Sequence, residues 1–408
     1  MVLARVRRGV LACLVCVLLL AAGCVRATPT PEPATITFAF LDSGRAYYEP
    51  LVAEFNQEYP YITVDLDDKP RRGAHILASA DVALGGDWLL SGLLDQGAVA
   101  DLDALIEQDA AIELEDFYPG AIEHFTRQGK MWAIPAGLDG FVIFYNQDLF
   151  DRYGISYPGV DWTRQDFEEI VRSMRDPEGG VFGYGSPHVF LDVVLFVYAH
   201  GGRLFDDLYD PTRATFDDPL TVEALEWYFR LMFDYDAIPT QEEVRAWGAD
   251  VYAGFANNKV GMVLADVAQA GGGDPAQPWT MRWGMVPVPQ DAARFTVGMV
   301  KGYLISASTP YPDACWKWVQ FLSHRSPERL IPARKSVLES TEYEKRAGAE
   351  FVRAVRATMR GRLLNPVGVS SKLEPDMQLF ERAIDSIVSQ EATPQEAMTW
   401  AQRQAALK

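Results

Sequence analysis

The sequence predicts an α/β fold that is divided into two lobes. Strand-type and helix-type segments alternate near its start, and the connections between the strands are too long for hairpins. Such alternation is typical of parallel strands in an α/β sheet. The chain from Thr35 to Lys408 is also longer than one hydrophobic core usually supports, so we expect two lobes.

The first strands and helices follow each other closely. Residues 35–40 (TITFAF) form an apolar run of strand type, and apolar side chains then recur at helical spacing from Tyr48 to Tyr59. Residues 62–66 (ITVDL) alternate apolar and polar side chains, which predicts a second strand. Residues 81–84 (DVAL) predict a third strand, and the segment WLLSGLLDQG that follows predicts another helix.

The loops after these strands are candidate ligand loops. In open α/β sheets the ligand crevice lies beyond the carboxyl ends of the strands. Asp42 and Ser43 follow the first strand, and Trp88 follows the third. We therefore expect these three residues to face one cleft.

Longer amphipathic helices dominate the rest of the chain. Three apolar stripes at helical spacing predict core faces: Leu225, Phe229, Met232 and Phe233; Cys315, Trp318, Val319 and Leu322; Met377, Phe380, Ile384, Ile387 and Val388. Thr393, Pro394 and Glu396 have the spacing of a capping box that opens the last helix. Cys315 is accordingly expected to be a small core residue rather than a nucleophile.

The N-terminus has the layout of a secretory signal peptide. Three arginines precede an apolar run that ends at Ala22, which is shorter than the roughly 20 residues of a membrane anchor. Ala-Ala-Gly before Cys24 resembles the lipobox of bacterial lipoproteins, in which the cysteine is lipidated and becomes the new N-terminus. Residues 25–34 alternate proline with polar residues, which predicts an extended spacer.

Charge and cysteine content narrow the partners. Loss of residues 1–23, which hold three arginines and no acid, lowers the net charge from −19 to −22. Such an acidic chain argues against nucleic acid or an acidic surface as the partner. With Cys13 and Cys16 in the signal peptide and Cys24 at the lipid site, Cys315 remains alone, so no internal disulfide is expected.

The order of several segments resembles the extracellular solute-binding proteins of the sugar-binding type, relatives of the maltodextrin-binding protein. The segments that carry this resemblance are FNQEYPYITVDL, GKMWAIPAGLDGFVIFYNQDLF, GGRLFDDLYDPTRATFDDPLTVEALEWYFRLM, FANNKVGMVL, WGMVPVP, YPDACWKWVQFLS, PARKSV and TPQEAMTWAQ. The resemblance implies a two-lobed periplasmic-binding-protein-like fold of type II with a ligand cleft between lobes joined by hinge segments. It also implies the binding component of an ATP-driven importer, with a membrane permease as partner. We expect no cofactor and no metal.

These expectations divide the chain into six segments. They are a lipoprotein signal peptide (1–23), a lipid-anchored linker (24–34), the N-lobe in two parts (35–138 and 288–326) and the C-lobe in two parts (139–287 and 327–408). The protein is expected to be a monomer, tethered through Cys24 to the outer face of the bacterial membrane or located in the periplasm.

Asp139 is the first candidate ligand residue of the middle segment. In WAIPAGLDGFVIFYN, a proline-glycine turn is expected to place Asp139 just before an apolar strand, near the crossing between lobes. Matching positions in the resembled family often accept sugar hydroxyls. The alternative is that Asp139 only caps a turn, and Tyr145 in the same motif either contacts ligand or packs in the hinge.

Aromatic side chains are the second indication of a sugar, because the C–H faces of pyranose rings are apolar while their edges are polar. Trp88 and Trp247 are candidate stacking residues, since both lie in loops where ligand contacts are expected. The other tryptophans that we assign to structural roles are Trp227, Trp316 or Trp318, and Trp400.

Further candidates lie in later segments. Asp266 follows the strand predicted in FANNKVGMVL, and Gly298, Lys301 and Tyr303 lie in FTVGMVKGYLIS, where an ordinary strand is the alternative. Arg334 matches a position where the resembled family often has a polar contact or a hinge residue. Because these contacts are acidic and aromatic rather than arginine-rich, the expected solute is neutral and hydroxyl-rich, such as a mono- or oligosaccharide.

Two other classes of protein are alternatives to a binding protein. A secreted glycosidase needs a pair of carboxylates, and 56 acidic residues supply many pairs, but the sequence holds no G-x-S-x-G, P-loop or H-E-x-x-H motif. The five histidines are scattered without metal-ligand spacing. A surface adhesion or scaffold lipoprotein would share the tether but would not need cleft-facing aromatics. The sequence therefore favours a binding protein that is not an enzyme.

Overall fold

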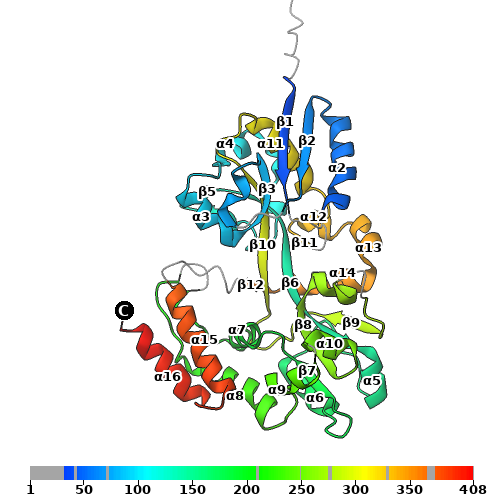
Figure 1. Cartoon of the computed structure of the whole chain (residues 1–408), viewed down its shortest axis with the longest axis vertical. Helices are drawn as coiled ribbons and strands as arrows, with labels where there is room; N and C mark the ends of the chain where they lie inside the picture. The colour runs from blue at the N-terminus through cyan, green and yellow to red at the C-terminus, as the bar shows by residue number, and fades with distance from the viewer. Residues whose placement is uncertain are drawn as a thin grey trace, which may run out of the picture.

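The computed structural model describes residues 32–40, 44–69, 73–207, 211–248, 250–273, 278–327, 330–364 and 373–407. Two lobes follow each other along the long axis of the molecule, and strands β6 and β10 run between them (Figure 1). Three candidates, Cys24, Asp42 and Ser43, lie outside the described residues, as does the signal-peptide segment. Within the described ranges, no helix has the length and apolar character that a membrane span requires.

The upper lobe in Figure 1 is built on the strands that the sequence predicts. β1 (Ala34–Ala39) pairs in parallel with β2 (Ile62–Asp67) and with β3 (Val82–Gly86). The strand order is β2-β1-β3-β10-β6, and β10 runs antiparallel to β3. β4 (Thr126–Arg127) and β5 (Lys130–Met131) form a small separate sheet. In the helix labels, η marks a 3-10 helix. The helices of this lobe are α2 (Arg45–Glu58), η1 (Gly73–Leu77), η2 (Asp87–Leu89), α3 (Leu90–Asp95), α4 (Asp103–Gln108), η3 (Ala110–Ile112), η4 (Leu114–Asp116), η5 (Glu123–Phe125) and α11 (Pro312–Ser323).

The lower lobe continues the same sheet through β6, β8 and β7. β8 (Val260–Asp266) pairs antiparallel with β6 and parallel with β7 (Phe182–Gly185), and β9 (Trp283–Val286) also pairs with β6. The helices of this lobe are α5 (Gln147–Tyr153), α6 (Arg164–Met174), α7 (Val189–His200), α8 (Pro219–Phe233), α9 (Gln241–Ala246), α10 (Val251–Ala256), η6 (Val267–Gly272), α15 (Glu374–Val388) and α16 (Pro394–Ala405).

The segment after α11 runs from the upper to the lower lobe along one flank (Figure 1). It consists of β11 (Ile331–Pro332), α12 (Lys335–Leu338), α13 (Thr341–Ala347), α14 (Ala349–Thr358) and β12 (Arg362–Leu364). β11 pairs with β6, and β12 pairs in parallel with β10, so this segment is attached to both crossing strands.

The crossing strands are longer than the sequence predicts. β6 (Ile134–Asn146) contains Pro135 and Gly137, so the turn that we expected before Asp139 is wrong and Asp139 lies inside a strand. The proline is accommodated at an irregularity, because the pairing between β6 and β10 (Phe295–Ile305) shifts by one residue between Lys301 and Gly302. The chain therefore stays extended where it passes between the lobes.

Apolar side chains fill each lobe in the pattern that the helical stripes predict. Trp318 packs edge-on against Phe38 and Phe55 in the upper lobe, and Cys315 on the same helix is buried. The lower lobe has its own cluster, which includes the stripes of α8 and α15. The capping box at Thr393 and Glu396 is confirmed at the start of α16. The division of the chain at residues 139, 288 and 327 stays a prediction.

Candidate ligand-binding site

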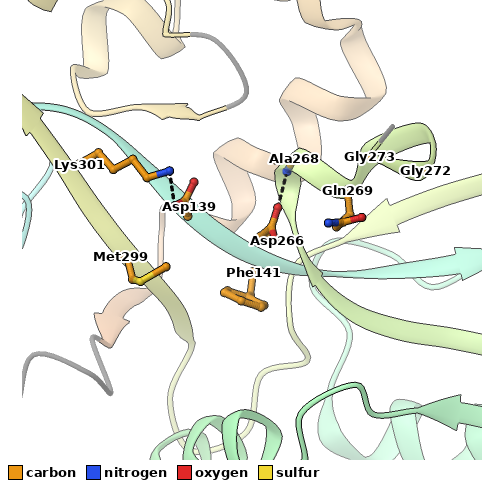
Figure 2. A pocket seen from close by; sticks show the side chains of 9 residues that line it. All are labelled: Asp139, Phe141, Asp266, Ala268, Gln269, Gly272, Gly273, Met299 and Lys301. Atoms are coloured by element: carbon orange, nitrogen blue, oxygen red, sulfur yellow. Dashed lines mark hydrogen bonds and ion pairs between the residues drawn. The ribbon is translucent and has the colours of Figure 1, made fainter. Parts of the chain in front are cut away.

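A cavity of about 510 Å³ lies where β6, β8 and β10 meet between the lobes (Figure 2). It is lined by Asp139, Phe141, Asp266, Ala268, Gln269, Gly272, Gly273, Met299 and Lys301. Three of the predicted ligand residues, Asp139, Asp266 and Lys301, are thus brought together from three separate strands.

The register of the sheet explains this convergence. Asp139 on β6 is directly opposite Met299 on β10, and Phe141 on β6 is directly opposite Asp266 on β8. Residues opposite each other share one face of a sheet, and so do residues two apart along a strand. Asp139, Phe141, Asp266, Met299 and Lys301 therefore all lie on the face that lines the cavity.

Lys301 and Asp139 form an ion pair between the two crossing strands. The Lys301 Nζ atom lies 2.8 Å from Asp139 Oδ2, and 21% of the lysine side chain and 11% of the aspartate side chain are exposed. A charge-assisted bond of this length, shielded from water, is among the stronger polar contacts in proteins. It fixes the positions of an acceptor and a donor that line the cavity, and Figure 2 marks their contact with a dashed line.

Asp266 has a different environment. Its Oδ1 atom accepts a hydrogen bond of 2.8 Å from the backbone N–H of Ala268, which caps the start of η6. Burial and then repulsion by Asp139 raise the pKa of Asp266, while the backbone N–H groups and Lys301 act in the opposite direction with smaller effects. The carboxylate is therefore held at the cavity by the backbone rather than by a cationic side chain.

Trp88 lies close to this face although it is not part of the cavity lining. It belongs to η2, directly after β3, and 44% of its surface is exposed. Gly86 pairs with Lys301, and a Cβ atom on Gly86 would lie only 1.7 Å from a ring atom of Trp88. The indole ring thus occupies the space where a side chain at Gly86 would lie, on the same face of the sheet as Lys301.

A family model described as bacterial extracellular solute-binding protein matches residues 40–324, which is well over half of the chain. The chain belongs to this family. A Brucella abortus protein whose name records only a binding function is 24% identical over 293 residues, which cover 68% of each chain. The family consists of extracytoplasmic binding proteins rather than enzymes, so the prediction of a solute-binding protein is confirmed.

Solved structures confirm the two-lobed type II fold of this solute-binding protein. The sugar-binding protein MalE from Xanthomonas citri superimposes with a TM-score of 0.75 at 18% identity, covering 91% of this chain and 96% of that chain. An ABC substrate-binding protein from Listeria monocytogenes, solved in complex with cycloalternan, gives a TM-score of 0.72 at 20% identity, covering 92% and 98%. At these identities the likeness establishes the fold.

Two predicted tyrosine contacts of the solute-binding protein are buried away from the cavity. Tyr303 lies in the core of the upper lobe, where the centre of its ring is 6.2 Å from the centre of the Phe38 ring. Burial raises the pKa of the Tyr303 hydroxyl well above its usual value. Tyr145 lies at the far end of β6, where its ring packs 5.3 Å from the Phe150 ring. Both side chains serve the packing of a lobe.

Trp247 is also distant from the cavity. It caps the end of α9, and its ring centre lies 6.0 Å from that of Phe182 at the start of β7. Because β7 and β8 are parallel, Phe182 pairs with Val260 at the opposite end of β8 from Asp266. The structure therefore separates Trp247 from Asp266 by the length of a strand.

The polar capacity of Arg334 is used inside the upper lobe. Its side chain is 1% exposed, and its guanidinium lies 3.3 Å from Asp116, donates to Ser323 Oγ and to the carbonyl of Ile112, and stacks over the ring of Phe117. Burial lowers the pKa of this arginine, and Asp116 opposes that effect. The arrangement connects α11, η3 and η4 and does not reach the cavity.

Several lining residues were not predicted. Phe141 and Met299 are each two residues from a predicted contact, so the two-residue period of a strand would have identified them once Asp139 and Lys301 were placed.

The predicted contact Gly298 is buried and pairs with Gly140, next to the cavity. Among the described residues, no group of three or more histidine, cysteine or acidic side chains could hold a metal ion.

Proposed function

We propose that the protein is the solute receptor of an ABC importer and that its solute is a mono- or oligosaccharide. The observation that carries the proposal is the cavity in which Asp139, Asp266 and Lys301 meet between the lobes. Structural relatives described as a sugar-binding protein and as an ABC substrate-binding protein with cycloalternan support the same class of solute.

The polar groups of the cavity suit hydroxyl groups. Asp139 and Asp266 supply carboxylate acceptors, and the Lys301 ammonium supplies donors, so one hydroxyl can donate to a carboxylate and accept from the lysine. Phe141 and the exposed ring of Trp88 are apolar surfaces on which the C–H face of a sugar ring can stack. Small-molecule sites are typically concave and contain a few polar groups that orient the ligand.

Binding would be coupled to closure through the crossing strands. β6 and β10 connect the lobes, and their register shift at Lys301 lies beside the ion pair with Asp139. A solute that contacts both lobes has a higher affinity for the closed arrangement and shifts the population toward it. The permease would recognise the rims of both lobes only when they are close together.

The tether belongs to the same proposal. A lipid on Cys24 and the spacer 24–34 would hold a monomeric receptor at the outer face of the membrane. Attachment raises the effective concentration of the receptor near its permease without any new contact. Import would then depend on the ATPase on the other side of the membrane.

Thermal unfolding of the full-length protein in detergent, with sugars, polyols, amino acids and short peptides, tests the proposal. A ligand at about 100 times its dissociation constant should stabilise the native state by roughly 2.7 kcal/mol. A raised midpoint with one group of sugars supports the proposal, and recovery of the unchanged sugar distinguishes binding from hydrolysis. Stabilisation by amino acids or peptides alone would contradict the carbohydrate class but not the receptor function.

A further inference from the structure

The cavity has an excess of negative charge. Among the described residues that line it, Asp139, Asp266 and Lys301 are the ionisable ones, so two carboxylates meet one ammonium group. The Lys301 ammonium lies 2.8 Å from Asp139, and the ion pair satisfies much of the charge of both groups. The charge of Asp266 is the one that remains to be balanced.

The surroundings of Asp266 favour a positive charge next to it. Burial and then repulsion by Asp139 raise the pKa of Asp266, and the opposing attraction by Lys301 is smaller. Asp266 lines the same cavity as the Asp139 carboxylate, whose ion pair already engages Lys301. The 2.8 Å hydrogen bond to its Oδ1 atom comes from a neutral backbone N–H. A cation in the cavity would therefore stabilise the ionised form of Asp266, whereas an anion would destabilise it.

The cavity offers an organic cation suitable neighbours. Phe141 lies directly opposite Asp266 in the register, and Met299 lines the same face. An aromatic ring attracts an ammonium group by its negative face, and a thioether packs well against the adjoining carbon atoms. These apolar neighbours of Asp266 therefore suit an organic cation.

We infer that the solute carries a protonated amino group beside its hydroxyls and that Asp266 binds this amino group, an inference that rests on the proposed function. Asp139 and Lys301 then remain available for the hydroxyls, as in the proposed mode of sugar binding. The chemical class is an amino sugar or an oligosaccharide that contains one. This class differs from the neutral solute expected from the sequence, because the net charge of the cavity depends on which side chains the fold brings together.

Calorimetry with matched pairs of sugars tests the charge of the solute. The full-length protein in detergent is titrated near neutral pH with glucosamine and glucose, with galactosamine and galactose, and with the N-acetyl derivative of each amine. The protonated amine should bind at least tenfold more tightly than the hydroxyl counterpart. N-acetylation should remove this advantage, since it removes the charge and keeps the nitrogen.

An Asp266→Asn variant identifies the carboxylate. Asparagine keeps an oxygen that can accept from the Ala268 N–H, so the start of η6 should be preserved, and the unfolding midpoint without ligand checks this. The tenfold preference for the amine should fall to about one. Asp313→Asn, on the exposed first turn of α11, changes the net charge equally and should leave the preference intact.

The results distinguish failure of the amino-group inference from failure of the proposed sugar receptor. Equal affinities within each sugar pair, or a preference that survives in Asp266→Asn, would overturn the inference and leave the sugar receptor standing. If no sugar of either kind binds while another solute does, the carbohydrate class fails and the inference fails with it.

Discussion

The cavity and the interior of the lower lobe both contain aspartates with little access to water, but their partners differ. Asp192 in α7 is fully buried and accepts hydrogen bonds from the hydroxyls of Tyr184, at 2.8 Å, and Tyr228, at 2.9 Å. These partners come from β7 and α8, so the carboxyl connects three elements of one lobe. Asp139 and Asp266 instead lie at a cavity between lobes, where space remains for a solute.

This difference shows how to separate structural from functional polar groups in the molecule. A buried polar group whose bonding capacity is used by its own lobe stabilises that lobe, and its removal should reduce stability. A polar group that borders a cavity has capacity for a ligand, and its removal should reduce affinity. Arg334 and Asp192 are of the first kind, whereas Asp139 borders the cavity and is proposed to be of the second.

Arg334→Met should have the largest effect on stability. The change removes four polar contacts of a buried guanidinium and leaves Asp116 without its cation, which we expect to cost about 3–5 kcal/mol of unfolding free energy. Denaturant unfolding measures this cost. Solute affinity of the folded fraction should be unchanged. Weakened binding with normal stability would instead place Arg334 in the ligand site, as the sequence predicted.

Asp192→Asn should change the pH dependence of stability. Burial raises the pKa of Asp192 to about 7, so the folded protein holds this proton more tightly than the unfolded chain, whose value is about 3.9. The stabilisation is complete below about pH 4 and is lost as pH rises toward 7, with a size on the order of 2–4 kcal/mol. Asparagine has no such proton, so the variant should lose this decline.

Denaturant unfolding of the wild type and of Asp192→Asn at several pH values between 4 and 8 measures this pH dependence of stability. The difference between the two curves isolates Asp192 from the other titrating groups. Parallel curves would show that the carboxyl titrates alike in the folded and unfolded states. Solute affinity serves as the control, since the hydrogen bonds of Asp192 run to tyrosines inside the lobe.

Asp139→Ala should affect binding more than folding. Loss of a carboxylate that accepts sugar hydroxyls should cost about 1.5–3 kcal/mol of binding free energy, which calorimetry measures. The variant also leaves Lys301 without its ion-pair partner, so Asp139→Asn provides a comparison that keeps the shape of the side chain. Unchanged affinity in both variants would remove Asp139 from the site.

The sequence predicts local elements better than it predicts contacts. Strands 35–40 and 62–66 and the capping box at Thr393 are local patterns of side chains, and the structure confirms them. The extended path through Pro135 depends on pairing with β10, about 160 residues later, so a turn was the natural but wrong prediction. Patterns of residues near each other in the chain cannot report such pairing.

The same limit applies to the site. The sequence predicts Asp139 from an expected turn and family resemblance, Asp266 from a strand end and Lys301 from a glycine-containing segment. The fold brings all three to one cavity. Arg334 has the same chemical character in the sequence as a ligand contact. Its partners Asp116, Ile112 and Ser323 come from two other segments of the chain, and only the folded structure shows that they use its donors. Burial and partners, rather than residue type, separate the two cases.

Gly86 and Gly85 give a final comparison on one strand, with the smallest expected effect. A Cβ atom on Gly86 would overlap the Trp88 ring, whereas one on Gly85 would lie 2.7 Å from Leu304 in the core. Gly86→Ala should displace the indole and weaken the binding of a stacked sugar by about 0.5–1.5 kcal/mol with little loss of stability. Gly85→Ala should lower the unfolding midpoint and leave affinity nearly unchanged. Equal affinities in wild type and Gly86→Ala would show that Trp88 does not contact the solute, and the stacking surface would then be limited to Phe141.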